Sequence, residues 1–208
     1  MSMDPAAISP QPRRQARGER RIDQLLEAAA QVFADVGYEK ASTNAIAATA
    51  GVSPGTLYQF FANKEAIAQA LAERYAVELD AAHDEAFGLD GADLPTEALV
   101  DRITDTLIGF NLKHPAFKTV FAGPEAPPAL ACVVAPLHDR VVGRVERLIE
   151  ARRPELAAED RRRYAVVSTQ IFKSLAPLVL QAPARQRPTM IAELKRAMAA
   201  YLRTFDRT

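Results

Sequence analysis

Apolar residues recur along this chain at helical spacing, and no segment shows the sustained alternation of apolar and polar residues that is typical of a strand. From Arg21 onward, for example, Ile22, Leu25, Leu26 and Ala29 follow the i, i+3, i+4, i+7 pattern of an amphipathic helix. Glycine and proline breakers separate the helical segments. The pattern predicts an all-α protein, with helices from Arg21 to Gly37, after Ser42, over 54–61, from Asn63 past Leu79, and over 96–113, 116–121, 129–151, 156–181 and 188–206.

Individual residues predict where several of these helices begin and end. Gly37 is placed to end the first helix in a left-handed conformation. Ser42 and Asn63 are placed to cap the N-termini of the second and fourth helices. Pro136 and Pro177 fall inside two later helices, so we expect each of these to be kinked or split. Residues 1–18, which are rich in proline and polar side chains, are expected to form a flexible tail.

The composition excludes several kinds of site and location. Cys132 is the only cysteine, which excludes an intramolecular disulfide and any CxxC-type zinc or redox site. The N-terminus lacks the apolar stretch of a signal peptide, and no run approaches the roughly 18 apolar residues of a transmembrane helix. We therefore expect a cytoplasmic protein without a membrane span.

The charges balance over the whole chain, with 26 Lys and Arg residues against 26 Asp and Glu residues. This balance argues against a protein coated with nucleic acid but leaves room for a local basic patch. Over residues 13–21, five arginines stand beside a single acidic residue, Glu19. Because such a run is usually a solvated surface, it supports nucleic-acid binding only together with other features.

Residues 43–62 carry the most informative pattern. Two short helices that pack across a tight turn need a small residue where they cross and a glycine where φ is positive, and Ala47 and Gly51 meet these needs. Apolar residues stand on both sides of the turn, while the outward positions carry small or hydrogen-bonding groups. The pattern is typical of a helix-turn-helix, whose second helix enters the major groove of DNA. The alternative, an ordinary helical hairpin, does not need this spacing.

With these residues in place, the chain from about residue 20 to residue 70 resembles, without a gap, the N-terminal domain of the TetR family of bacterial transcriptional regulators. The resemblance implies a DNA-binding head over 19–65 and a helical ligand-binding and dimerisation body over 66–208. It also implies a homodimer that represses transcription until a small-molecule effector releases it from double-stranded operator DNA. The matching residues are Arg20-Arg21-Ile22, Ala28-Ala29, Phe33, Gly37-Tyr38, Ile46-Ala47, Ala50-Gly51-Val52-Ser53, Gly55-Thr56-Leu57-Tyr58, Phe61 and Lys64-Glu65.

The resemblance also implies DNA contacts residue by residue. Tyr58 and Lys64 match phosphate-contacting positions, where a phenol and an ammonium can both donate hydrogen bonds. Asn44 and Gln59 match base-facing positions, and their amides can pair with adenine. The full DNA-contacting set is Arg21, Ser42, Thr43, Asn44, Ser53, Pro54, Gly55, Thr56, Tyr58, Gln59 and Lys64.

Two residues depart from the family pattern. Pro54 stands where Lys or Arg is common, which removes one possible contact to guanine. Ala45 stands where an acidic residue is frequent, which weakens the start of the second helix.

In the body, the resemblance implies a mainly apolar pocket among the middle helices. The candidate lining residues are Leu107, Phe110, His114, Phe117, Phe121, Cys132, His138, Phe172 and Leu175, although an aromatic residue on a helix is more often core than pocket. The last two helices resemble a dimer interface, with packing inside one subunit as the alternative. Its candidates are Val166, Val167, Gln170, Ile171, Ser174, Leu178 and Val179 on one helix and Ile191, Leu194, Met198, Tyr201 and Leu202 on the other.

No pattern indicates catalysis or a metal. The three histidines, His83, His114 and His138, lie far apart without paired spacing, and the chain has no GxSxG, Walker A or GxGxxG motif. We therefore expect no cofactor, no metal and no enzymatic activity. A helical small-molecule-binding protein without specific DNA binding is the second interpretation, and an enzyme is the third.

Overall fold

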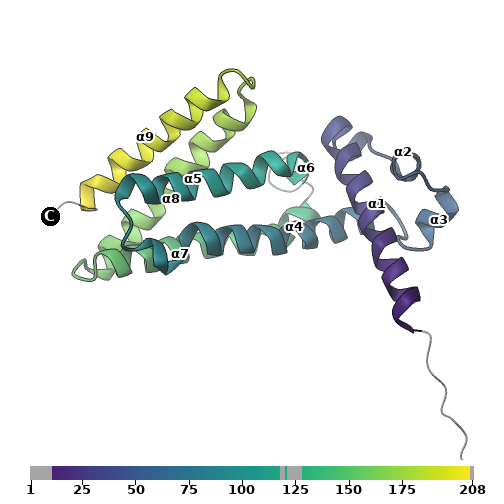
Figure 1. Ribbon diagram of the computed structural model, residues 1–208, viewed down its shortest axis with the longest axis horizontal. Helices are drawn as coiled ribbons and strands as arrows, with labels where there is room; N and C mark the ends of the chain where they lie inside the picture. Colours follow the sequence, from purple (N-terminus) through teal and green to yellow (C-terminus); the bar gives the residue numbers. More distant parts are fainter. Residues whose placement is uncertain (1–10, 118–119, 121–127, 207–208) are drawn as a thin grey trace, which may run out of the picture. The chain divides into compact units, whose positions relative to one another are not determined.

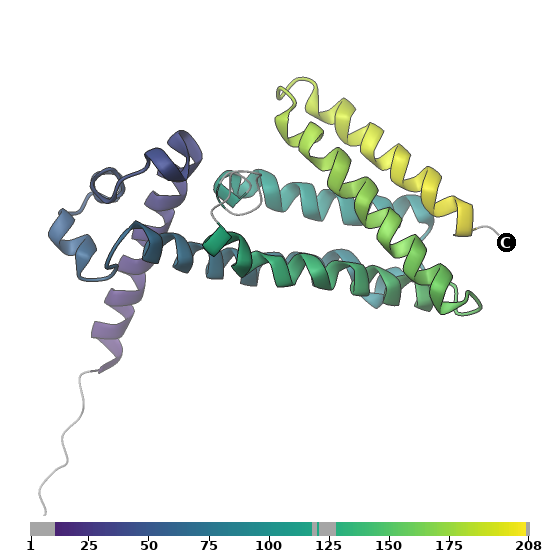
Figure 2. The same ribbon diagram turned by 180° about the vertical axis from the view of Figure 1, so that it is seen from behind.

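A computed structural model describes residues 11–117, 120 and 128–206, without the side chains of 11–15, 128–135 and 137–139 (Figures 1 and 2). In this described part every regular element is a helix, which confirms the all-α prediction. The chain divides into two compact units, Met1–Leu71 and Ala72–Thr208.

Unit 1 contains α1 (Gln11–Lys40), α2 (Thr43–Thr49), α3 (Pro54–Tyr58) and the first residues of α4 (Lys64–Phe87). Helix α2 packs against both α1 and α3 (Figure 1). Most of the apolar stripe predicted on α1 faces the core, because Leu25, Ala29 and Phe33 are wholly buried together with Ile46 and Leu57. Ile22, the first residue of the predicted stripe, is exposed. Three helices thus enclose one small core.

Helix α1 begins at Gln11, inside the segment that the sequence suggested was a tail. Residues 11–18 are helical because Pro12 lies in the first turn, where a proline costs no hydrogen bond, and the three arginines, the glutamine and the alanine that follow are good helix formers. The expected tail beyond this point, residues 1–10, lies outside the described residues.

Three residues shape the ends of the helices in unit 1. Gly37 interrupts α1 with φ of 77° and ψ of 166°, a region that is essentially restricted to glycine. The Ser42 hydroxyl accepts a hydrogen bond from the Ala45 amide at 3.1 Å, and the side-chain oxygen Oδ1 of Asn63 accepts one from the Ala66 amide at 2.8 Å. Both predicted N-caps are therefore confirmed.

Helix α3 ends at Tyr58, earlier than the predicted end near Phe61. Beyond Tyr58 the hydrogen bonds tighten to three-residue spacing: the Gln59 amide donates to Thr56 at 3.2 Å and the Phe60 amide to Leu57 at 2.9 Å. The chain turns out of the helix there and reaches the Asn63 cap.

Unit 2 contains the rest of α4, a short 3-10 helix η1 (Leu89–Gly91), and the helices α5 (Thr96–Lys113), α6 (Pro115–Phe117), α7 (Pro128–Arg152), α8 (Ala158–Gln181) and α9 (Arg187–Asp206). Helices α8 and α9 lie side by side, α8 also packs along α7, and α9 packs against α5 (Figure 2). The predicted bounds of α5 are confirmed, and those of α7, α8 and α9 agree within two residues. Part of the helix predicted over 116–121, including Phe121, lies outside the described residues.

The core of unit 2 is built from the facing stripes of these helices. Leu99, Val179 and Leu194 on α5, α8 and α9 are almost fully buried. Pro136 and Pro177 lie inside α7 and α8, and neither helix is split there, so the predicted split is wrong at both positions.

Candidate functional site

The turn between α2 and α3 has the geometry that a helix-turn-helix needs. Gly51 has φ of 64°, the left-handed conformation that the sequence predicted for it. The Val52 amide donates to the Ala47 carbonyl oxygen at 2.9 Å, which folds the chain back after α2. Ile46, Ala47 and Leu57 are wholly buried, so they fix the two short helices against each other.

The residues predicted to contact DNA all lie in unit 1, and most of them face solvent. Ser42, Asn44, Ser53, Pro54, Gly55, Tyr58 and Gln59 are exposed, and Arg21, Thr43, Thr56 and Lys64 are half-buried. An exposed row of hydroxyl, amide and phenol groups on α2 and α3 has no packing role inside the unit. It is therefore available for an external partner.

Tyr58 links the two helices of this surface. Its hydroxyl lies 3.0 Å from the Thr43 hydroxyl, and the Tyr58 side chain remains half exposed. Within α3, the Ser53 hydroxyl accepts from the Thr56 amide at 3.1 Å and lies 2.9 Å from the Thr56 hydroxyl. These contacts hold Tyr58 and Thr56 in place while leaving their outer faces open.

Lys64 has a role in the structure that the sequence did not reveal. Its ammonium donates to the main-chain carbonyl oxygens of Tyr38 at 2.9 Å and Glu39 at 3.3 Å and lies 4.4 Å from the centre of the Tyr38 ring. Two of its three N–H groups are thus engaged at the end of α1. The third is available to a phosphate.

Gln24 is a supporting residue that the sequence analysis missed. Its side-chain amide donates to the Ala50 carbonyl oxygen at 2.6 Å, at the end of α2, and its carbonyl oxygen accepts from Arg21 at 2.8 Å. Gln24 therefore connects the arginine-rich part of α1 to the turn. The i, i+3 spacing of Arg21 and Gln24 was visible in the sequence, but the contact with Ala50 depends on tertiary packing.

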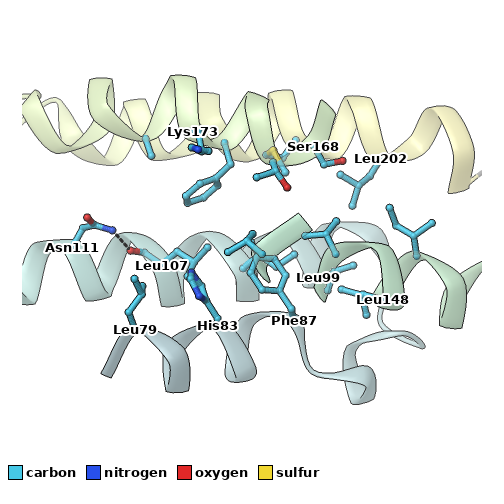
Figure 3. Close-up of a pocket in the computed structure, with 18 of the residues that line it drawn as sticks. Leu79, His83, Phe87, Leu99, Leu107, Asn111, Leu148, Ser168, Lys173 and Leu202 are labelled. Carbon is cyan, nitrogen blue, oxygen red and sulfur yellow. Dashed lines mark hydrogen bonds between the residues drawn. The ribbon is translucent and has the colours of Figure 1, made fainter. Parts of the chain in front are cut away.

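Unit 2 holds a cavity of about 210 Å³ (Figure 3). Helices α4 to α9 all contribute to its wall, which is mainly apolar. The lining residues are Leu79, His83, Phe87, Leu99, Ile103, Leu107, Asn111, Phe117, Val141, Val145, Leu148, Ile149, Arg152, Ser168, Thr169, Phe172, Lys173, Ala176, Pro177, Leu180, Met198, Leu202 and Phe205.

The predicted pocket residues divide into three groups. Leu107, Phe117 and Phe172 line the cavity. Phe110, His114 and Leu175 do not line it and pack into the surrounding core instead. Phe121 and the side chains of Cys132 and His138 lie outside the described residues.

Phe110 and His114 belong instead to an aromatic cluster with Tyr75 and Phe117. The ring centroids of Phe110 and His114 are 4.8 Å apart, and those of Phe110 and Phe117 are 5.2 Å apart. His114 Nε2 also lies 2.9 Å from Glu78 Oε2. Burial lowers the pKa of His114 more than the Glu78 charge raises it, so the imidazole is neutral at pH 7.

The sequence pattern did not indicate the polar residues that line the cavity. His83 and Ser168 are both 4% exposed, and Asn111, Thr169, Lys173 and Arg152 complete the polar set. Asn111 continues the four-residue spacing of Leu99, Ile103 and Leu107 on α5, a signal that the sequence contained.

The part of the chain that the structure describes contains no cluster of three His, Cys, Asp or Glu residues that could hold a metal ion. Among the same residues, no helix is both long enough and apolar enough to cross a membrane.

Comparison with known proteins gives matches to both units. The family model described as "Bacterial regulatory proteins, tetR family" matches residues 25–71, and the one described as "Tetracyclin repressor-like, C-terminal domain" matches residues 95–202. The second match alone covers more than half of the chain.

Among curated relatives, the A-factor receptor protein of Streptomyces griseus is 39% identical over 88 residues, which are 42% of this chain and 29% of the relative. The HTH-type transcriptional regulator UidR of Escherichia coli is 45% identical over 47 residues, 23% of this chain and 24% of the relative. The chain thus spans less than a third of the length of these relatives. The crystal structure of a TetR-like transcriptional regulator from a Rhodococcus species has a TM-score of 0.66 at 21% identity, covering 90% of this chain and 97% of the other, and it shows the fold.

Proposed function

Because this chain belongs to the TetR family of bacterial transcriptional regulators, we propose that it is a repressor that leaves its operator when a small molecule occupies the cavity of unit 2. As a member of this family it is a transcriptional regulator and not an enzyme. The observation that carries the proposal is the presence, in one chain, of an exposed helix-turn-helix surface and a preformed apolar cavity.

We assign DNA recognition to residues 19–65. Helix α3 enters the major groove, with Gln59 at its C-terminal end and Asn44 on α2 reading base edges. Tyr58 and the free N–H of Lys64 contact phosphates, which position the head without reading sequence. The hydrogen bond between Tyr58 and Thr43 supports this division of roles, because it presents the phenol from a fixed position at the edge of the surface.

We assign effector binding and dimerisation to residues 66–208. Several candidates for the dimer interface are buried inside the chain: Val179, Leu194, Met198 and Leu202 are at most 7% exposed, so they cannot meet a second copy. Exposed residues remain on α8 at four-residue spacing, namely Val166, Gln170, Ser174 and Leu178. This stripe is the surface that we propose for pairing two copies in an isologous contact.

Helix α4 relates the two activities. Its first residue, Lys64, is held by the end of α1 in unit 1, while Leu79, His83 and Phe87 of the same helix line the cavity. An effector releases DNA only to the extent that it binds one arrangement of the protein more tightly than the other. To shift the population ratio of these two arrangements from 1:99 to 99:1, the effector needs about 5.5 kcal/mol of such differential affinity.

Selection of bound fragments from the source genome, followed by mobility-shift assays, tests the proposal. Gln59→Ala should relax the preference at one base position per half-site by about 1–3 kcal/mol, whereas Gln31→Ala, an exposed glutamine of α1, should not. A reporter gene behind the selected fragment gives the sign of regulation. Failure to select any specific fragment would favour a small-molecule-binding protein without operator recognition.

A further inference from the structure

Most of the wall of the cavity in unit 2 is apolar, and Asn111 and Lys173 lie toward one end of it (Figure 3). Leu148 and Leu202 lie toward the other end, with Leu99 and the buried Ser168 beside them. Thr169 lies on α8 one turn before Lys173, so the two side chains share a helix face. Such a cavity suits a molecule that is itself apolar at one end and polar at the other.

Two hydroxyl groups in the wall have no hydrogen-bond partner. Ser168 Oγ and Thr169 Oγ1 are both buried, and neither bonds to the carbonyl oxygen one turn earlier, as helical hydroxyls often do. Leaving a buried hydroxyl unpaired costs free energy, so such groups are rare in native proteins without a functional reason. A ligand in the cavity would supply the missing partner.

The charges of the wall favour an anion. No Asp or Glu is among the described residues that line the cavity. Of its two fixed cations, Arg152 is already bound, because its guanidinium donates to Asp206 at 2.6 Å and to the Leu94 carbonyl oxygen at 2.7 Å. Lys173 forms no ion pair with any described residue, so its ammonium is available to a ligand.

The volume limits the size of the ligand. An engineered cavity of about 150 Å³ holds benzene, which corresponds to about 25 Å³ for each carbon atom. At that density the 210 Å³ cavity holds a body of about eight carbon atoms. The ammonium of Lys173, on an exposed residue, can meet a charged group at the rim of the cavity.

We propose that the effector is a small amphiphilic carboxylate, with its hydrocarbon body against Leu148 and Leu202 and its carboxylate bound by Lys173 and Thr169. This inference rests on the proposed function, since it names the chemical class of the effector. Both side chains can donate hydrogen bonds to carboxylate oxygens, and hydrogen bonds between charged groups are stronger than those between neutral groups.

Calorimetric titration of the full chain without DNA tests the class directly. The probes are straight-chain carboxylates of about six to ten carbons, centred on octanoate, with 1-octanol and octylamine as neutral and cationic counterparts of the same length. We expect octanoate to bind at least about ten-fold more tightly than octylamine, with 1-octanol between them. Equal binding of octylamine, or no binding of any carboxylate, would overturn the proposal.

Two substitutions locate the carboxylate. Lys173→Met should weaken octanoate binding by about ten-fold and leave 1-octanol binding unchanged, while the control Lys40→Met, an exposed lysine of unit 1, should change neither. Thr169→Val should weaken octanoate binding and raise the melting temperature of the ligand-free protein, because it removes an unpaired hydroxyl at nearly constant volume. Its control is Thr189→Val, at an exposed threonine of α9 outside the cavity wall.

If Lys173→Met weakens the binding of octanoate and of 1-octanol equally, the lysine only shapes the cavity wall. That result would overturn the proposed carboxylate contact. Operator release is measured separately. Octanoate that binds without releasing DNA contradicts the proposed function and leaves the ligand class standing. Release of DNA by a different molecule, with no carboxylate bound, rejects the ligand class and leaves the proposed function standing.

Discussion

The ammonium of Lys64 lies 2.9 Å from the main-chain carbonyl oxygen of Tyr38 and 4.4 Å from the centre of the Tyr38 ring. The first residue of α4 thus holds the last turn of α1, directly after the interruption at Gly37. An ammonium over an aromatic face and against a carbonyl oxygen combines a cation–π contact with a charge-assisted hydrogen bond. The same side chain that we propose for phosphate contact therefore also positions the elements of unit 1.

Lys64→Ala should lower the stability of unit 1 by about 1–2 kcal/mol, because two charge-assisted hydrogen bonds to partly exposed carbonyl oxygens are lost. If Lys64 also contacts a phosphate, the slope of log K against log salt should become shallower by about 0.9 for each contact removed. Denaturant titration and salt-dependent mobility shifts measure the two effects. Lys40→Ala is the matched control, and an unchanged slope in folded Lys64→Ala would limit the residue to a positioning role.

Gly37→Ala should destabilise the protein by about 1–3 kcal/mol, since φ of 77° with ψ of 166° strains any residue with a Cβ. The added methyl meets no atom within 4 Å, so the cost is conformational rather than steric. Gly18→Ala is the matched control, because Gly18 lies in the regular part of α1 with open space around it. That substitution should stabilise the helix by about 0.5–1 kcal/mol. Thermal melts that shift in the same direction for both variants would contradict this account.

The helix bounds could be read from the sequence where breakers flank a periodic stretch. Helix α5 is the clearest case, because Pro95 precedes it and His114-Pro115 follows it. The start of α1 could not be read in this way. The proline of that segment, Pro12, is compatible with a first helical turn, so composition alone did not separate a tail from a helix.

The helix-turn-helix surface was predictable because its residues lie within a short stretch of sequence and its turn needs a glycine at one position. The contacts of Lys64 with Tyr38 and of Gln24 with Ala50 each span 26 residues, so no local pattern reveals them. The cavity wall was predicted only in part for the same reason. Helical spacing shows which faces are apolar, but the packing of several helices decides which of those faces enclose a space.

Asp206→Asn should remove a stabilising ion pair that depends on pH. Arg152 and Asp206 are 2.6 Å apart with side chains only 10% and 11% exposed, and the Thr96 hydroxyl also donates to this carboxylate. Burial raises the pKa of Asp206, but the hydrogen bonds from Arg152 and Thr96 outweigh it, so the pKa lies below its ordinary value.

A depressed pKa means that this stabilisation is fully present above the unfolded value of about 3.9 and is lost as pH falls through the folded value. At pH 7 we expect Asp206→Asn to cost about 3 kcal/mol, because it leaves the Arg152 charge without its partner. The difference in the free energy of unfolding between Asp206→Asn and the natural protein should shrink below about pH 4. Denaturant titrations across this range check it, with Glu193→Gln, from the exposed pair with Arg196, as control. A stability difference that does not change with pH would show that the carboxylate charge of Asp206 does not provide the stabilisation.

Phe110→Ala and Phe172→Ala should have different consequences, because only Phe172 lines the cavity. Phe110 is 7% exposed and packs against Phe117 and His114, so its truncation should cost about 3–5 kcal/mol and depress stability and operator binding together. Phe172 is half-buried, so its truncation should cost less stability while it enlarges the cavity. We expect Phe172→Ala to retain operator affinity and to alter the effector concentration needed for release. Melting temperature, operator affinity and effector response measured on both variants decide the matter, and a parallel loss of all three in Phe172→Ala would place that residue in the core.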